Sequence, residues 1–105
     1  MKRLLIAAAL IALTVPAIAG SESAERAGVK VGAYNNYFSP KKITVGRGTK
    51  VTWVIRQGVH NIRGGGTNSP NLSRGRTYSK KYKRRGTFGY VCTLHPGMNG
   101  KVVVR

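Results

Sequence analysis

The stretch 49-TKVTWVIR-56 decides the fold class, because its side chains alternate between two kinds. Val51, Trp53 and Ile55 share one face of an extended chain, whereas lysine, threonine and arginine side chains occupy the other face. Alternation with a period of two is typical of a β-strand that covers a core on one side. The stretch therefore predicts a sheet with Trp53 on its inner face.

Similar short runs, separated by turn residues, follow from residue 29 to the C terminus, and none has helical periodicity. We expect strands at 29–34, 42–45, 49–56, 76–83, 87–92 and 101–105. The segment 63-RGGGTNSPNLSRG-75 shows no strand pattern, and its three consecutive glycines predict the most mobile part of the chain. These features predict a small all-β fold, an antiparallel Greek-key β-sandwich, with a small Greek-key barrel as the alternative.

The first nineteen residues have the organisation of an export signal. A basic start precedes an apolar run from Leu4 to Val15, and 17-AIA-19 supplies the small residues that a signal peptidase accepts. The run is short for a membrane span, and an uncleaved N-terminal anchor is the alternative. Cleavage would leave a flexible leader at 20–28 and one domain at 29–105, located in the periplasm or outside the cell.

The charge is strongly one-sided. Nineteen Lys and Arg residues face two acidic residues, Glu22 and Glu25, and the formal net charge is +17. This field attracts acidic proteins, phospholipid headgroups and polyanions, and the attraction should weaken with salt. The run 80-KKYKRR-85 resembles a nucleic-acid or heparin patch, but in a strand and turn of an exported protein we interpret it as a solvated edge. Nucleic acid is therefore an unlikely partner.

Cys92 is the only cysteine, and it lies in the stretch 92-CTLHPGM-98 together with His95 and Met98. A single cysteine forms no internal disulfide, so in an oxidising compartment its thiol is intermolecular, reactive or bound to a metal. The only other histidine, His60, follows the tryptophan strand. A thiolate, two imidazoles and a weak thioether are the donors of a blue-copper site. The sequence thus contains the minimum set for one copper ion.

Three other interpretations of the cysteine are open. It could be an inert buried thiol, a nucleophile paired with a histidine, or a zinc ligand. An inert thiol leaves the spacing to His95 and Met98 unexplained, and no orienting acid or oxyanion hole accompanies a nucleophile. A zinc site has no use for the thioether. We therefore expect a binding protein and not an enzyme.

The run 90-YVCTLHPGMNGKVVV-104, with 60-HNI-62 and 49-TKVTWVI-55, resembles the cupredoxins. It is most similar to the amicyanin branch of the plastocyanin-like proteins, which has the same Cys-x-x-His-x-x-Met spacing. The resemblance covers residues 29–105 and implies a cupredoxin-like copper-binding domain. Lys80 departs from the family pattern, because relatives favour an apolar residue there; it can reach solvent if its face lies near a sheet edge.

The resemblance also implies the role of each site residue. The copper ligands would be His60, Cys92 and His95 in the equatorial plane and Met98 on the axis. Asn61 would brace the ligand loop from outside the coordination sphere, through a hydrogen bond toward Thr93.

Together these features predict a small exported type 1 blue copper protein that carries single electrons between redox partners by Cu(II)/Cu(I) cycling. We expect His95 to lie nearest the surface, within an apolar collar that includes Leu94 and Pro96. A monomer would meet a redox partner with an acidic surface, or an anionic membrane surface, with its cations steering the encounter. The alternatives are a periplasmic copper carrier or storage protein without redox cycling, and a basic domain that binds polyanions.

Overall fold

The computed structural model of the protein describes residues 28–105; the expected signal peptide at 1–19 and all but the last residue of the leader at 20–28 lie outside this range. The described residues form eleven strands and no helix. The strands are β1 (Val29–Tyr34), β2 (Tyr37–Ser39), β3 (Lys42–Val45), β4 (Thr49–Ile55), β5 (Val59–His60), β6 (Arg63–Gly64), β7 (Thr67–Asn68), β8 (Leu72–Ser73), β9 (Thr77–Tyr82), β10 (Gly86–Val91) and β11 (Asn99–Val104). Accordingly, the described chain has no helix of the length and apolarity that crossing a bilayer requires.

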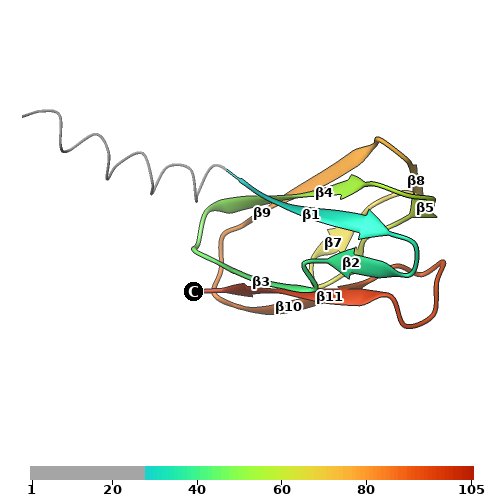
Figure 1. Cartoon of the computed structure of the whole chain (residues 1–105). Helices are drawn as coiled ribbons and strands as arrows, with labels where there is room; N and C mark the ends of the chain where they lie inside the picture. Colours follow the sequence, from blue (N-terminus) through green and yellow to red (C-terminus); the bar gives the residue numbers. More distant parts are fainter. Residues whose placement is uncertain (1–27) are drawn as a thin grey trace, which may run out of the picture.

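Two main sheets face each other across the core (Figure 1). One has the strand order β2-β1-β4-β9 and the other β3-β11-β10-β6-β7, while β5 and β8 form a separate two-stranded ribbon. The predicted all-β sandwich is confirmed, but the sheets are mixed and not purely antiparallel. β1 pairs with β4 in parallel, and so does β3 with β11. Parallel neighbours need a crossover connection, and β3 provides one by joining the opposite sheet between β1 and β4.

Six strands lie where the sequence predicts them, with ends that differ by at most two residues. The interpretation of 63–75 as a segment without strands is wrong, because β6, β7 and β8 lie within it. Gly64, Gly65 and Gly66 all have positive φ, which allows the tight turn from β6 to β7. A Cβ on Gly65 would lie 2.5 Å from the carbonyl oxygen of Gly89, so this turn packs directly on the backbone of β10.

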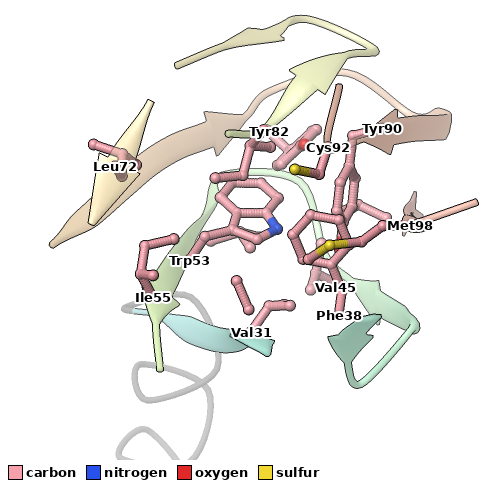
Figure 2. Close-up of a cluster of buried hydrophobic side chains, with 14 of the residues drawn as sticks. Val31, Phe38, Val45, Trp53, Ile55, Leu72, Tyr82, Tyr90, Cys92 and Met98 are labelled. Carbon is pink, nitrogen blue, oxygen red and sulfur yellow. The ribbon is translucent and has the colours of Figure 1, made fainter. Parts of the chain in front are cut away.

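The core is centred on Trp53, which is fully buried on the inner face of β4, as its alternation predicts (Figure 2). Its ring meets that of Tyr90 edge to face, with centroids 5.2 Å apart. Phe38, on β2, also packs edge to face against Tyr90, with ring centroids 4.9 Å apart. Because Tyr90 precedes Cys92 by two residues, the aromatic core extends along β10 as far as the cysteine.

The two ends of the sandwich carry different connections (Figure 1). The loop of residues 92–98 between β10 and β11 lies at one end, which we call the ligand end, together with the β5–β8 ribbon. The β3–β4 and β9–β10 connections and the C terminus lie at the opposite end. β10 runs from one end to the other, so whatever binds at one end is separated from the other by the length of a strand.

Candidate metal centre

The loop after β10 closes on itself through its backbone. The amide of Cys92 donates to the carbonyl of Met98 at 2.9 Å, and the amide of Met98 donates to the carbonyl of His95 at 3.2 Å. Gly97 has a φ of 80°, a left-handed conformation that glycine adopts without strain. This closed loop holds a thiol, an imidazole and a thioether within seven residues.

Three of the four predicted donor atoms come together at the ligand end. The Sγ of Cys92 lies 3.7 Å from Nδ1 of His60 and 3.5 Å from Nδ1 of His95. The ligand atoms of the three side chains all lie within 4.8 Å of one another. Ligands about 2.0–2.3 Å from a common ion in a trigonal plane are separated by roughly 3.5–4 Å. The spacing therefore fits one metal ion with little movement of the side chains.

His60 reaches this position from outside the loop, because β5 pairs with β8 and directs its ring toward the cysteine. Its side chain is fully buried, and its Nε2 has no hydrogen-bond partner among residues 28–105. Burial lowers the pKa of His60; the backbone of Gln57 partly offsets this effect and the nearby His95 reinforces it. A lowered pKa favours the neutral imidazole, which is the form that binds metals.

His95 and Met98 differ in their exposure. His95 is half-buried and is the most exposed of the four predicted ligands, in agreement with the sequence-based expectation. Met98 is 1% exposed. Figure 2 shows its sulfur in the same cluster of buried side chains as the sulfur of Cys92. The centre therefore has one donor that approaches solvent and three that are enclosed by the protein.

Asn61 links the ligand loop to the rest of the domain. It is 1% exposed, and its Nδ2 donates to Oγ1 of Thr93 at 2.8 Å. Its Oδ1 accepts a hydrogen bond from the amide of Thr93 at 2.9 Å, so the pair is held at two points. Nδ2 also donates to Oδ1 of Asn71 at 2.9 Å. The contact with Thr93 is the one that the resemblance implies, whereas no sequence pattern indicates Asn71, which lies in the segment expected to lack strands.

The chemistry of the donor set selects among metals. Residues 28–105 contain no aspartate or glutamate, so the described domain lacks the carboxylate side chains that commonly bind magnesium and calcium. A thiolate with two imidazoles suits copper or zinc, and a buried thioether beside them favours copper. The residues present therefore fit a copper ion.

Comparison with known proteins agrees with this chemistry, although no model of a protein family matches the sequence. The chain is 33% identical to amicyanin-alpha of Methylorubrum extorquens over an alignment of 118 positions, which covers 99% of both chains. It is 36% identical over 101 residues to a chloroplastic plastocyanin of Tetradesmus obliquus, covering 79% of this chain and 70% of the relative. The crystal structure of amicyanin from Paracoccus versutus matches 74% of this chain and 81% of its own, with a TM-score of 0.69 and 27% identity. This chain therefore belongs to the amicyanin and plastocyanin family of cupredoxins.

Proposed function

We propose that the protein is a type 1 blue copper protein that carries single electrons between redox partners. The observation that carries the proposal is the convergence of one thiol sulfur and two imidazole nitrogens within 4.8 Å. His60, Cys92, His95 and Met98 would hold the copper ion, with the thiolate and the two imidazoles as the main donors and the thioether as the weak one. When bound, the copper ion accepts and releases one electron by cycling between Cu(II) and Cu(I). The protein acts as an electron carrier and not as an enzyme.

The ligand frame supports electron transfer more than copper delivery. His60 is fully buried, and Cys92 and Met98 are 3% and 1% exposed, so a copper acceptor has little access to three of the four donors. The closed loop and the hydrogen bonds of Asn61 hold the donors in one arrangement. A frame that moves little between oxidation states keeps the reorganisation energy small. A carrier or storage protein needs the opposite, namely ligands that can be exchanged.

His95 is the route by which electrons leave and arrive. Its half-buried ring lies between two exposed neighbours in the loop, Leu94, which is 43% exposed, and Pro96, and we infer that they form an apolar collar. Such a collar lets a partner approach the ring closely and exclude water. The partner is a redox protein, since the electron must pass to a second centre.

Three exposed arginines, which we call the ligand-end arginines, lie at the same end of the sandwich. They are Arg56, Arg74 and Arg76. The turn that contains the last two is tied to the end of β4, because the carbonyl of Arg76 accepts from the amide of Ile55 at 3.0 Å. Cations around an apolar collar steer a partner with an acidic surface toward the ligand end. We infer that the redox partner is acidic there.

Location and assembly follow from the same proposal. Residues 1–19 are a cleaved signal peptide, residues 20–28 are a leader, and residues 29–105 work in the periplasm or outside the cell. Membership of the family supports export. Removal of Lys2 and Arg3 with the signal leaves 17 basic and 2 acidic residues, a formal charge of +15, which makes self-association unfavourable, and we infer a monomer.

The test is the absorption spectrum and electrochemistry of the copper-loaded protein. We expect an intense visible thiolate-to-Cu(II) band and a reversible one-electron wave, and Cys92→Ser should lose both. A second variant, Met98→Gln, should keep the band and shift the reduction potential, because the axial ligand tunes the potential. Copper that binds without the band refutes the blue-copper assignment. An absorption band without a reversible electrochemical wave, together with loss of copper to a modest chelator, supports the alternative of a copper carrier without redox cycling.

A further inference from the structure

The end of the sandwich opposite the ligand end is covered by cations, and we call it the cationic end. It is formed by five exposed residues, Arg47, Lys83, Arg84, Arg85 and Arg105. They lie in three separate segments that the backbone ties together. The amide of Arg47 donates to the carbonyl of Arg105 at 3.2 Å, and the amide of Gly48 donates to the carbonyl of Tyr82 at 2.6 Å.

These charges have no aspartate or glutamate side chain as a counterpart in the described domain. Of the nineteen Lys and Arg residues, three precede Gly28 and sixteen lie within residues 28–105, where there is no Asp or Glu. Some cations even face each other across strands: Lys50 is in register with Lys81, and Lys42 with Lys101. Like charges directly opposite each other destabilise a sheet. An anionic surface beside such a pair would reduce this repulsion.

A cleft with cationic walls opens beside the cationic end. It has a volume of about 270 Å³, and Lys80, Lys83 and Arg84 line it together with Gly66 and Phe88. Lys80 is half-buried, and its ammonium lies 5.4 Å from the centroid of the Tyr82 ring. This residue is the departure from the family pattern noted in the sequence. The cleft offers cations to a phosphate group and an aromatic wall to the carbon atoms attached to it.

The position of the cationic end favours a partner that exchanges no electrons with copper. β10 separates the β9–β10 connection from Cys92, and six strand residues span about 20 Å. A redox protein docked at the cationic end would be far from His95. The chain also joins the domain near this end, since Val29 pairs with Val51 near the start of β4.

We propose that the cationic end docks on the anionic phospholipid headgroups of a membrane, with the ligand end directed away from the bilayer. The cations Lys83, Arg84 and Arg85 of the β9–β10 connection, which we call the hairpin cations, make the main contact. The cleft beside them receives a headgroup phosphate. Docking itself does not depend on copper, whereas the orientation has a use only if the ligand end meets a redox partner.

The test measures binding of the purified, processed protein to vesicles of phosphatidylcholine with and without phosphatidylglycerol. The hairpin variant Lys83→Gln/Arg84→Gln/Arg85→Gln is compared with a control in which the three ligand-end arginines become glutamine. Both variants lose the same charge and keep the same N terminus. We expect the hairpin variant to bind anionic vesicles roughly a hundred-fold more weakly, because each of its three lost cations near the surface contributes about a fivefold gain in affinity. The control should change binding only a few-fold, because its charges lie more than a Debye length of about 10 Å from the surface.

Several outcomes would overturn the proposal. Equal losses in the two variants would mean that net charge alone attracts the protein, and absence of binding to phosphatidylglycerol vesicles would remove the partner. Tighter binding to soluble polyglutamate than to vesicles, lost in the hairpin variant, would assign the cationic end to an acidic protein. The orientation of the docked protein is tested separately, by the rate at which a soluble reductant reduces the Cu(II) protein. We expect the rate for vesicle-bound protein to equal that for free protein, because the ligand end is directed away from the bilayer. Thermal unfolding of each variant shows that it is folded.

Discussion

Replacing Asn61 by alanine should destabilise the domain strongly, because its polar side chain is buried and makes three hydrogen bonds. Each bond contributes about 0.5–1.5 kcal/mol net. Two of the three hydrogen bonds join Asn61 to Thr93. Because Thr93 is exposed, water can hydrogen-bond to it in place of the missing Asn61 side chain. The expected loss in the free energy of unfolding is therefore about 2–3 kcal/mol, near the middle of the range. For a domain of this size that corresponds to a decrease in Tm of roughly 10–20 °C.

Asn71→Ala is the matched control, since it removes one of the same hydrogen bonds from an exposed position. It should cost about 0.5 kcal/mol or less. Both variants are compared with the parent in urea, in the copper-free and thiol-reduced form, through the emission of the buried Trp53. The double variant should be no less stable than Asn61→Ala alone, because Asn71 acts through Asn61. A loss below about 1 kcal/mol for Asn61→Ala, or equal losses for the two single variants, would refute the claim that Asn61 fixes the loop.

Two further predictions concern the sheet and the glycine turn. Lys81→Glu should stabilise the domain by about 0.5–1 kcal/mol, because it places a negative charge opposite Lys50, and the gain should shrink in high salt. The control is Lys30→Glu, which makes the same change in charge opposite Thr52. An equal gain in both variants would mean that only the net charge matters. Gly65→Ala should cost about 1–3 kcal/mol more in thermal or urea unfolding than Gly75→Ala. Both glycines have positive φ, but only the first would bring a Cβ within 2.5 Å of a neighbouring carbonyl oxygen, and equal costs would show that the backbone yields there.

The parts that the sequence predicts well are those in which each residue carries its own signal. Alternation around Trp53 indicates which face of the strand is buried, and the chemistry and spacing of Cys92, His95 and Met98 indicate a metal site. The prediction of His60 depends on the small number of histidines and on the resemblance of 60-HNI-62 to the cupredoxins, and not on any periodic pattern. Its placement depends on β5 and β8, two-residue strands that are too short to produce a periodic pattern.

The features that the sequence does not predict depend on which strands become neighbours. Alternation shows which face of a strand is buried but not which strand lies beside it, so the parallel pairs β1·β4 and β3·β11 could not be anticipated. The three consecutive glycines at 64–66 suggest mobility, because glycine permits many conformations. In the structure it is used for a tight turn, since only a residue without a Cβ fits against Gly89. The opposite placement of the ligand loop and the run 80–85 is also a property of the topology.

One compositional fact links the two ends of the molecule. Residues 28–105 contain no aspartate or glutamate, so the ligand end offers hard divalent cations no carboxylate side chain. The same absence leaves the cations of the opposite end without acidic side chains to pair with, so their fields extend into solvent. Introducing one carboxylate near Cys92 would weaken metal selectivity, and introducing a few near Arg84 would neutralise the docking surface. The two properties are therefore kept by one constraint on composition, while the length of β10 keeps them far enough apart to act independently.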